Sequence, residues 1–270
     1  MIHFLSTPIT RNQEEQVKYR WKTFWWLLVV FVIAAIANIP HSRAVNELTS
    51  QSVDLEKQSI FQSIVGNAGA ALVMGSIFIW IGLWLSARAN LGAPLVVKLL
   101  TGKSFLDTIK KRTIATTILV GATTGFLMLG LLKIQHYVLP MGIAKVSHPS
   151  AIPNLFASFS AGITEEIIFR LGFMSLVISV ILYLTKTTAP TKGIIWTGNI
   201  LTAILFGLIH IPMSGNYYDL TPIVIGTTVL GNVITGTTFG WIFWRYGLIM
   251  AMIAHFIFDV VFHVIGSPFG

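Results

Sequence analysis

Two adjacent carboxylates and a guanidinium interrupt an apolar run near the middle of the chain, in the order Glu165, Glu166 and Arg170. Ionisable side chains within the hydrocarbon layer are costly, so they usually face the interior of a helix bundle and mark function. Glu166 and Arg170 are four residues apart, which on a helix predicts an ion pair. Glu165 is left about 100° around the helix, unpaired, and suits a general base. The alternative is a purely structural ion cluster.

Imidazoles occur in two later apolar runs. Phe206-x-x-x-His210 ends the fifth run, and His255-x-x-x-Asp259 lies in the last. Because His255 and Asp259 are four residues apart, they share a helix face and can hydrogen-bond or converge on a ligand. His263 extends that stripe, but its place near the end of the run indicates an interfacial residue. We therefore leave His263 out of the predicted site.

These three motifs, in this order and within apolar runs, resemble those of the CAAX protease and bacteriocin-processing family, which includes the type II CAAX prenyl endopeptidases. The resemblance covers residues 150–265. Gly172 is displaced by one position from an arginine-glycine pair that is common in the family. Asp259 stands where many members carry asparagine. The resemblance implies an intramembrane endopeptidase.

The resemblance also implies roles for the matched positions. Glu165 and His210 would activate a water for attack on a peptide carbonyl, and His255 with Asp259 would support the oxyanion. An ionised Asp259 would repel an oxyanion, so this residue must either be protonated or act behind His255 and fix its tautomer. The remaining motif residues are assigned to structural support, namely Glu166, Arg170 and Phe206.

A zinc protease is the nearest alternative, because Glu165, His210 and His255 form a plausible set of three ligands with an open fourth position. The chain contains no His-Glu-x-x-His motif, so the ligands would have to come from three helices. We therefore expect catalysis without a metal or other cofactor. The chain has no cysteine, which excludes a cysteine nucleophile and a thiolate metal site.

Other classes of protein remain open. The same intramembrane groups suit a transporter or a non-catalytic membrane scaffold involved in peptide export or bacteriocin self-immunity. If the chain is a protease, its expected partners are membrane lipid and a peptide or lipidated protein. The family trims prenylated C-terminal tripeptides in some members and is linked to peptide maturation or immunity in bacterial ones. The basic residues gather in short loops, so nucleic acid is not expected.

The elements that must position these residues are membrane helices. The chain is 54% hydrophobic and only 10% charged, which is typical of a polytopic membrane protein. Apolar runs predict an all-α bundle of seven or eight spans, at about 24–39, 64–86, 114–132, 154–184, 194–212, 222–243 and 248–265. The fourth run is long enough to be tilted, kinked near Gly172, or split into two helices. The spacings Gly121/Gly125 and Gly236/Gly240 predict close helix packing, while Asn232 with Thr235 suits either interhelical bonding or pocket lining.

Lysine and arginine counts predict the orientation. Residues 1–23 hold four of these cations and residues 87–113 hold six, so both segments should be cytoplasmic and the protein a multi-pass component of the cell membrane. We predict three parts: the cytoplasmic segment 1–23, N-terminal membrane helices in 24–150, and a catalytic core in 151–270. One conflict remains, because His255 lies roughly 10 Å into its span whereas His210 ends the fifth run. If the two meet, the fifth helix must start later or extend past His210, or the fourth run must be divided differently.

Overall fold

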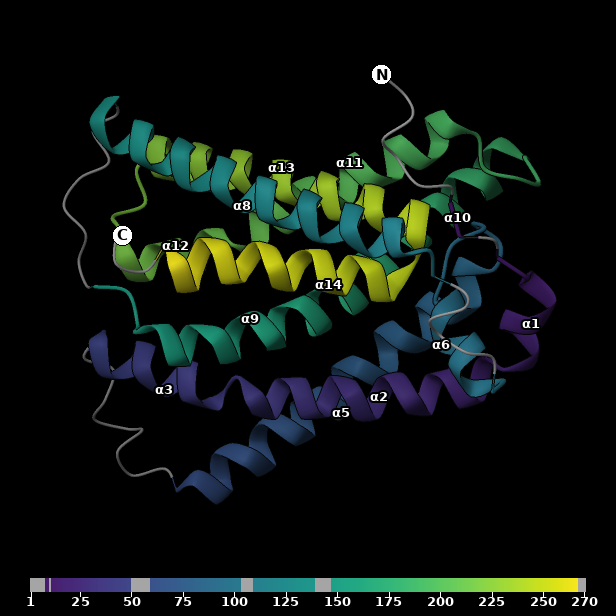
Figure 1. Ribbon diagram of the computed structural model, residues 1–270, viewed down its shortest axis with the longest axis horizontal. Coiled ribbons are helices and arrows are strands. Elements are labelled where there is room, and N and C mark those ends of the chain that lie inside the picture. The colour runs from purple at the N-terminus through teal and green to yellow at the C-terminus, as the bar shows by residue number, and fades with distance from the viewer. Residues whose placement is uncertain (1–7, 10, 50–58, 103–108, 139–146, 267–270) are drawn as a thin grey trace.

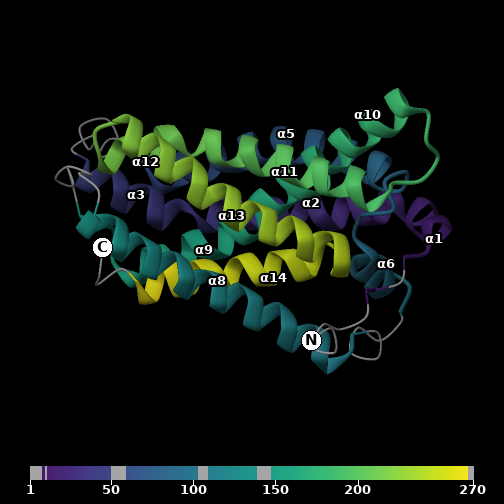
Figure 2. The same ribbon diagram turned by 90° about the horizontal axis from the view of Figure 1, so that it is seen from above.

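The computed structural model describes residues 8–9, 11–49, 59–102, 109–138 and 147–266, and within them it is an all-α bundle. Its long helices lie side by side along one axis (Figures 1 and 2). The elements run in the order α1 (Gln13–Lys18), α2 (Arg20–Ala37), α3 (Ile39–Leu48), α5 (Ile60–Ser86), α6 (Pro94–Leu100), α8 (Lys111–Val138), α9 (Ala151–Glu165), η1 (Glu166–Met174), α10 (Ser175–Thr185), α11 (Lys192–Ile209), α12 (Ile211–Tyr217), α13 (Pro222–Tyr246), α14 (Leu248–Asp259) and η2 (Val260–Ile265).

Seven helical segments of the described chain are long and apolar enough to cross a membrane. They coincide with the seven predicted runs and confirm a polytopic bundle. The cytoplasmic position of the N-terminus and the three-part division of the chain stay predictions. The N-terminal helix α2 packs against α5 and α9, so the first spans support the later ones directly.

The long fourth run forms one continuous helical segment, Ala151–Thr185, and is not split. Its middle part, η1, is a π-helix that begins at Glu166. Such wide turns are rare and occur often at functional sites. A second π-helical stretch, η2, follows directly after Asp259. Both helices that carry carboxylates of the predicted site therefore leave α-helical geometry next to those carboxylates.

Close helix contacts depend on glycine, as the spacings predicted. A Cβ atom on Gly121 would lie 2.5 Å from the carbonyl oxygen of Ala254, and one on Gly125 would lie 2.8 Å from the Cβ of Val261. These contacts bring α8 against α14 and η2. On α13, Gly236 lies against Ala203 of α11. The predicted packing role of the glycine pairs is confirmed, and it fixes the rotation of α14 about its axis.

Helix α14 begins inside the molecule. Gly247, with a φ of +83°, is the one residue between α13 and α14, and Leu248 donates a backbone hydrogen bond to the carbonyl of Gly92 at 3.2 Å. The short helix α6 covers this turn, and its first four residues are buried. The last span therefore starts below the surface of the bundle.

Candidate active site

Glu166 and Arg170 form the predicted ion pair at the centre of the bundle. The Nε of Arg170 lies 3.3 Å from the Oε2 of Glu166, and both side chains are 0% exposed. The guanidinium also lies over the ring of Phe206, 5.3 Å from its centroid. Removal of either partner would therefore leave an unpaired charge away from water.

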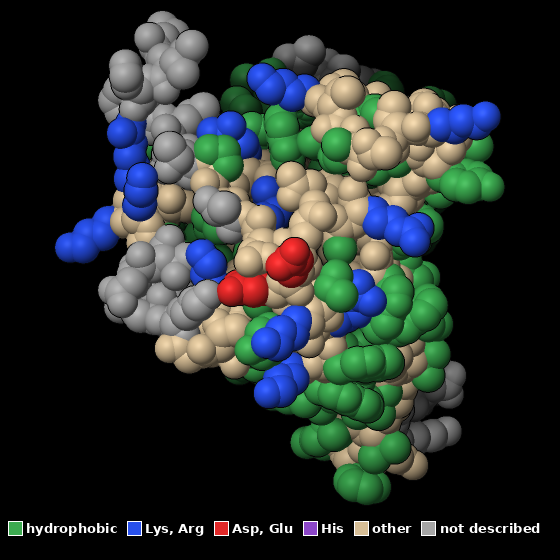
Figure 3. Space-filling model, turned by 90° about the vertical axis from the view of Figure 1, so that its right-hand side faces the viewer, with side chains coloured by type: hydrophobic (Ala, Val, Ile, Leu, Met, Phe, Trp, Pro, Cys, Tyr) green, Lys and Arg blue, Asp and Glu red, His purple; other side chains and the backbone are tan. Residues whose placement is uncertain are grey.

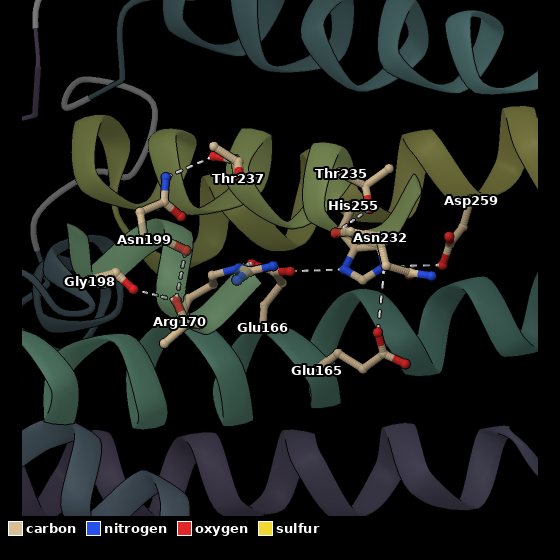
Figure 4. A network of polar contacts seen from close by, with 11 residues as sticks. Glu165, Glu166, Arg170, Gly198, Asn199, Asn232, Thr235, Thr237, His255 and Asp259 are labelled. Atoms are coloured by element: carbon tan, nitrogen blue, oxygen red, sulfur yellow. Dashed lines mark hydrogen bonds and ion pairs between the residues drawn. The ribbon is translucent and has the colours of Figure 1, made fainter. Parts of the chain in front are cut away.

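The second oxygen of Glu166 binds an imidazole from the last span. The Nδ1 of His255 lies 2.9 Å from the Oε1 of Glu166, and both groups are buried (Figure 4). Glu166 thus connects Arg170 to His255. Sequence analysis assigned Glu166 only to the support of its own helix and did not foresee this bond, because the two residues are 89 positions apart.

Both ring nitrogens of His255 face carboxylate oxygens. The Nε2 atom lies 3.5 Å from the Oδ2 of Asp259 and 3.9 Å from the Oε2 of Glu165 (Figure 4). We considered that Asp259 would fix the tautomer of His255 from behind. The structure gives that position to Glu166, which holds Nδ1, and places Asp259 on the opposite nitrogen with Glu165. The predicted residues of η1 and α14 thus converge on one imidazole.

Glu165 differs from its neighbours in exposure. Its side chain is 27% exposed, whereas Glu166 is 0% and Asp259 is 6% exposed. Its contact with His255 is longer than a hydrogen bond. Among the carboxylates around His255, Glu165 is the one that solvent reaches most easily, and a proton acceptor for water needs that access.

Aromatic rings fix the plane of the His255 imidazole. Phe239 of α13 stacks on it, with ring centroids 4.5 Å apart and an interplanar angle of 18°. Phe206 of α11 meets the same ring edge-on, with centroids 6.3 Å apart. Phe239 was missed as a site residue by sequence analysis. Its only signal is its position between the closely packed residues Gly236 and Gly240.

His210 lies beside this cluster at the junction of α11 and α12. Its ring lies 4.4 Å from that of Phe206, and its Nδ1 lies 2.7 Å from the Phe206 carbonyl oxygen. A carbonyl oxygen only accepts hydrogen bonds, so Nδ1 carries the proton and Nε2 is an acceptor in the neutral ring. Phe206, rather than a direct hydrogen bond, connects His210 with His255.

The conflict in depth is resolved at both helices. The fifth span extends past His210 to Tyr217 through α12, so His210 lies within the span and not at its end. Helix α14 starts below the surface, under α6, which carries His255 further into the bundle than the length of its own span indicates. The extension of the fifth span past His210 is one of the options that the sequence analysis gave for bringing the two imidazoles together.

Residues outside the predicted set also contact it. His263, which we left out, has its Nε2 3.9 Å from the Oδ1 of Asp259, with a side chain that is 46% exposed.

Asn232 and Thr235 donate to backbone carbonyls of their own helix, at Thr228 and Asn232 respectively. These hydrogen bonds lie within one helix, so they do not provide the interhelical bonding that was one of the two predicted roles of this pair.

The zinc alternative requires Glu165, His210 and His255 to act as ligands together. Within the described segments, no group of three or more histidine, aspartate and glutamate side chains is arranged to hold a metal ion. His210 has its Nδ1 on the Phe206 carbonyl, and the Phe206 ring contacts both imidazoles, with centroids 4.4 Å from His210 and 6.3 Å from His255. The three residues therefore do not fit a zinc site in this arrangement. Catalysis without a metal stays a prediction.

Comparison with known proteins gives one family. The model of the family described as Type II CAAX prenyl endopeptidase Rce1-like matches residues 148–261, which hold the whole cluster around His255. No curated protein and no solved structure matches the chain.

Proposed function

Because residues 148–261 match the Type II CAAX prenyl endopeptidase Rce1-like family, we propose that this chain is an intramembrane endopeptidase that hydrolyses a peptide bond with an activated water. Glu165 takes the proton from that water while the Nε2 of His210 orients it, and the water oxygen adds to the peptide carbonyl carbon. The proton then passes from Glu165 to the leaving amine as the C–N bond breaks. His255 donates a hydrogen bond to the oxyanion as it forms.

One observation carries this assignment, namely the different surroundings of two adjacent carboxylates. Glu166 is 0% exposed and faces both Arg170 and His255, so solvent does not reach it. Glu165 is partly exposed and lies 3.9 Å from the same imidazole. A water that approaches Glu165 therefore also approaches the imidazole of His255, which would stabilise the oxyanion that forms when the water attacks the peptide carbonyl.

Asp259 works through His255 in this scheme. Its Oδ2 lies 3.5 Å from the Nε2 of His255, so its negative charge favours a proton on that nitrogen, the one that would donate to the oxyanion. Its Oδ1 lies 3.9 Å from the Nε2 of His263, a contact longer than a hydrogen bond. Such an arrangement keeps the carboxylate beside the oxyanion donor without making it the donor.

The substrate that we propose is a prenylated C-terminal peptide of the CAAX type, the class that the family description names. A prenylated peptide is concentrated at a bilayer by its lipid chain, which suits an active site reached from within the membrane. Peptides of the bacteriocin type are the second substrate class, and their cleavage is to be compared with that of prenylated peptides.

The experiment uses purified protein in detergent with fluorogenic peptides, prenylated and unmodified. We expect Glu165→Gln and His210→Ala to lower kcat on the prenylated peptide by roughly 10²-fold or more, because each removes a proton-transfer or orienting group. Glu47→Gln, an exposed carboxylate on α3, is the matched control and should keep full activity.

The outcome that contradicts the proposal is cleavage by Glu165→Gln at the rate of the native protein. Absence of cleavage of every peptide by the native protein, together with an unchanged cellular phenotype of Glu165→Gln, would instead favour a scaffold. Flux of a peptide through reconstituted vesicles without cleavage would favour a transporter.

A further inference from the structure

A cavity lies away from His255, at the end of the bundle where α1, the start of α2 and the end of α5 meet. It is an open cleft with a volume of about 680 Å³. The charged and aromatic groups that line it matter most for the argument, and they are Glu14, Lys18, Arg20, Trp84 and Arg88. Nothing in the proposed reaction uses this cleft.

The cations of the cleft outnumber its carboxylates. Lys18, Arg20 and Arg88 line it together with one acid, Glu14. The guanidinium carbon of Arg20 lies over the Trp84 ring, 4.2 Å from its centroid. Its Nε is buried and has no hydrogen-bond partner among the described residues. A guanidinium held by stacking, with a donor unsatisfied, is suited to bind a planar or tetrahedral oxyanion.

The cleft lies at the level where lipid headgroups are expected. Arg20 begins the first membrane span and Ser86 ends the helix of the second, so both spans end beside it. Next to it, Trp21, Trp25 and Trp80 are 56%, 60% and 48% exposed on the outer faces of α2 and α5. Exposed tryptophan is typical of the boundary between lipid and water.

The surface around the cleft is positively charged, like the cleft itself. Figure 3 shows the end of the molecule that carries α1 and α6, with lysine and arginine side chains spread over it and few acidic ones. Juxtamembrane cations attract anionic lipids of the membrane surface. Charge, depth and flanking tryptophans therefore agree on one class of ligand.

We propose that this cleft binds the phosphate of an anionic phospholipid. Arg20 and Arg88 hold the phosphate oxygens, Lys18 adds a third positive charge, and the acyl chains lie along the aromatic surface of Trp80 and Trp84. Trp80 and Trp84 stack on each other, with centroids 5.2 Å apart, and Trp80 is 48% exposed, so this aromatic pair offers apolar surface beside the cleft.

The test measures binding and does not depend on protease activity. Native protein in nanodiscs of phosphatidylcholine is titrated with fluorescent phosphatidylglycerol, and the Arg20→Gln/Arg88→Gln variant is treated identically. We expect the double variant to bind about thirty-fold more weakly, about five-fold for each lost cation. Arg88→Gln alone, at an exposed position, should lower the affinity for phosphatidylglycerol about five-fold. This single variant keeps the test informative if the double variant misfolds.

A matched control removes two cations at the same end of the bundle but outside the cleft. Lys98→Gln/Lys192→Gln should keep native affinity for phosphatidylglycerol. An equal loss in this control would show that net charge alone attracts the lipid, and would overturn the site. Equal affinity of the native protein for phosphatidylcholine and phosphatidylglycerol would overturn it as well.

Competition separates a lipid from a free phosphate. We expect inorganic phosphate and glycerol phosphate to displace phosphatidylglycerol only at concentrations far above that of short-chain phosphatidylglycerol, because they lack the chains that contact Trp80. Displacement at similar concentrations would contradict the lipid assignment and indicate a site for soluble phosphate.

Discussion

The Nδ1 of His255 and the Oε1 of Glu166 lie 2.9 Å apart in the middle of the bundle, although they belong to different membrane spans. The bond joins the third motif of the chain to the first. It also gives Glu166 two partners, since Arg170 holds its other oxygen. The orientation of the imidazole therefore depends on a carboxylate that solvent does not reach.

Glu166→Gln should destabilise the protein far more than Glu165→Gln. The amide leaves the buried Arg170 without its counter-ion and weakens the bond to His255, a loss of roughly 3–5 kcal/mol for a buried pair broken on one side. Glu165 is partly exposed and its replacement leaves no charge buried alone. Thermal unfolding midpoints in detergent compare the two variants, and equal midpoints would contradict the central position of Glu166.

Phe239→Leu should lower kcat without a matching change in KM. The leucine keeps an apolar side chain at this position but loses the ring that stacks on His255 at 4.5 Å, a contact of about 1 kcal/mol or roughly five-fold in rate. Phe243→Leu, fully buried one turn further along α13, is the control. It should lose similar stability and keep its activity. The prediction is wrong if both variants change kcat alike.

Gly82→Ala should destabilise the contact between α5 and η1. The new methyl carbon would lie 2.6 Å from the carbonyl oxygen of Leu171, a backbone atom that cannot move aside without the helix. Overpacking of this kind costs about 1–3 kcal/mol. Gly69→Ala on the same helix meets no atom within 4 Å and should leave the unfolding temperature unchanged or slightly higher. Thermal unfolding of both variants checks the difference.

Peptide cleavage should survive a strong zinc chelator. Glu165 and His210 activate the water directly in the proposed scheme, and the described residues hold no three-ligand cluster for a metal. The measurement is the cleavage rate after dialysis against chelator, with a known zinc protease treated in parallel. Loss of activity that added zinc restores would return Glu165, His210 and His255 to the role of ligands.

Local patterns in the sequence were sufficient for the spans and for one ion pair. A membrane helix is recognised from the length of its apolar run, and all seven runs became spans. Glu166 and Arg170 were predicted to pair because residues four apart are neighbours on a helix. The change to π-helix at Glu166 was not predicted, since no residue type marks the start of such a turn.

Contacts between helices were decided only by the tertiary structure. The bond from Glu166 to His255 and the stacking of Phe239 depend on how deeply α14 lies and how it is rotated. Glycine contacts such as Gly121 against Ala254 set that rotation, and the buried turn at Gly247 sets the depth. An apolar run specifies that a helix crosses the membrane. It does not specify which face of the helix packs against its neighbours, because lipid is equally favourable to every apolar face. The sequence by itself therefore determined which residues are intramembrane, and packing determined which of them meet.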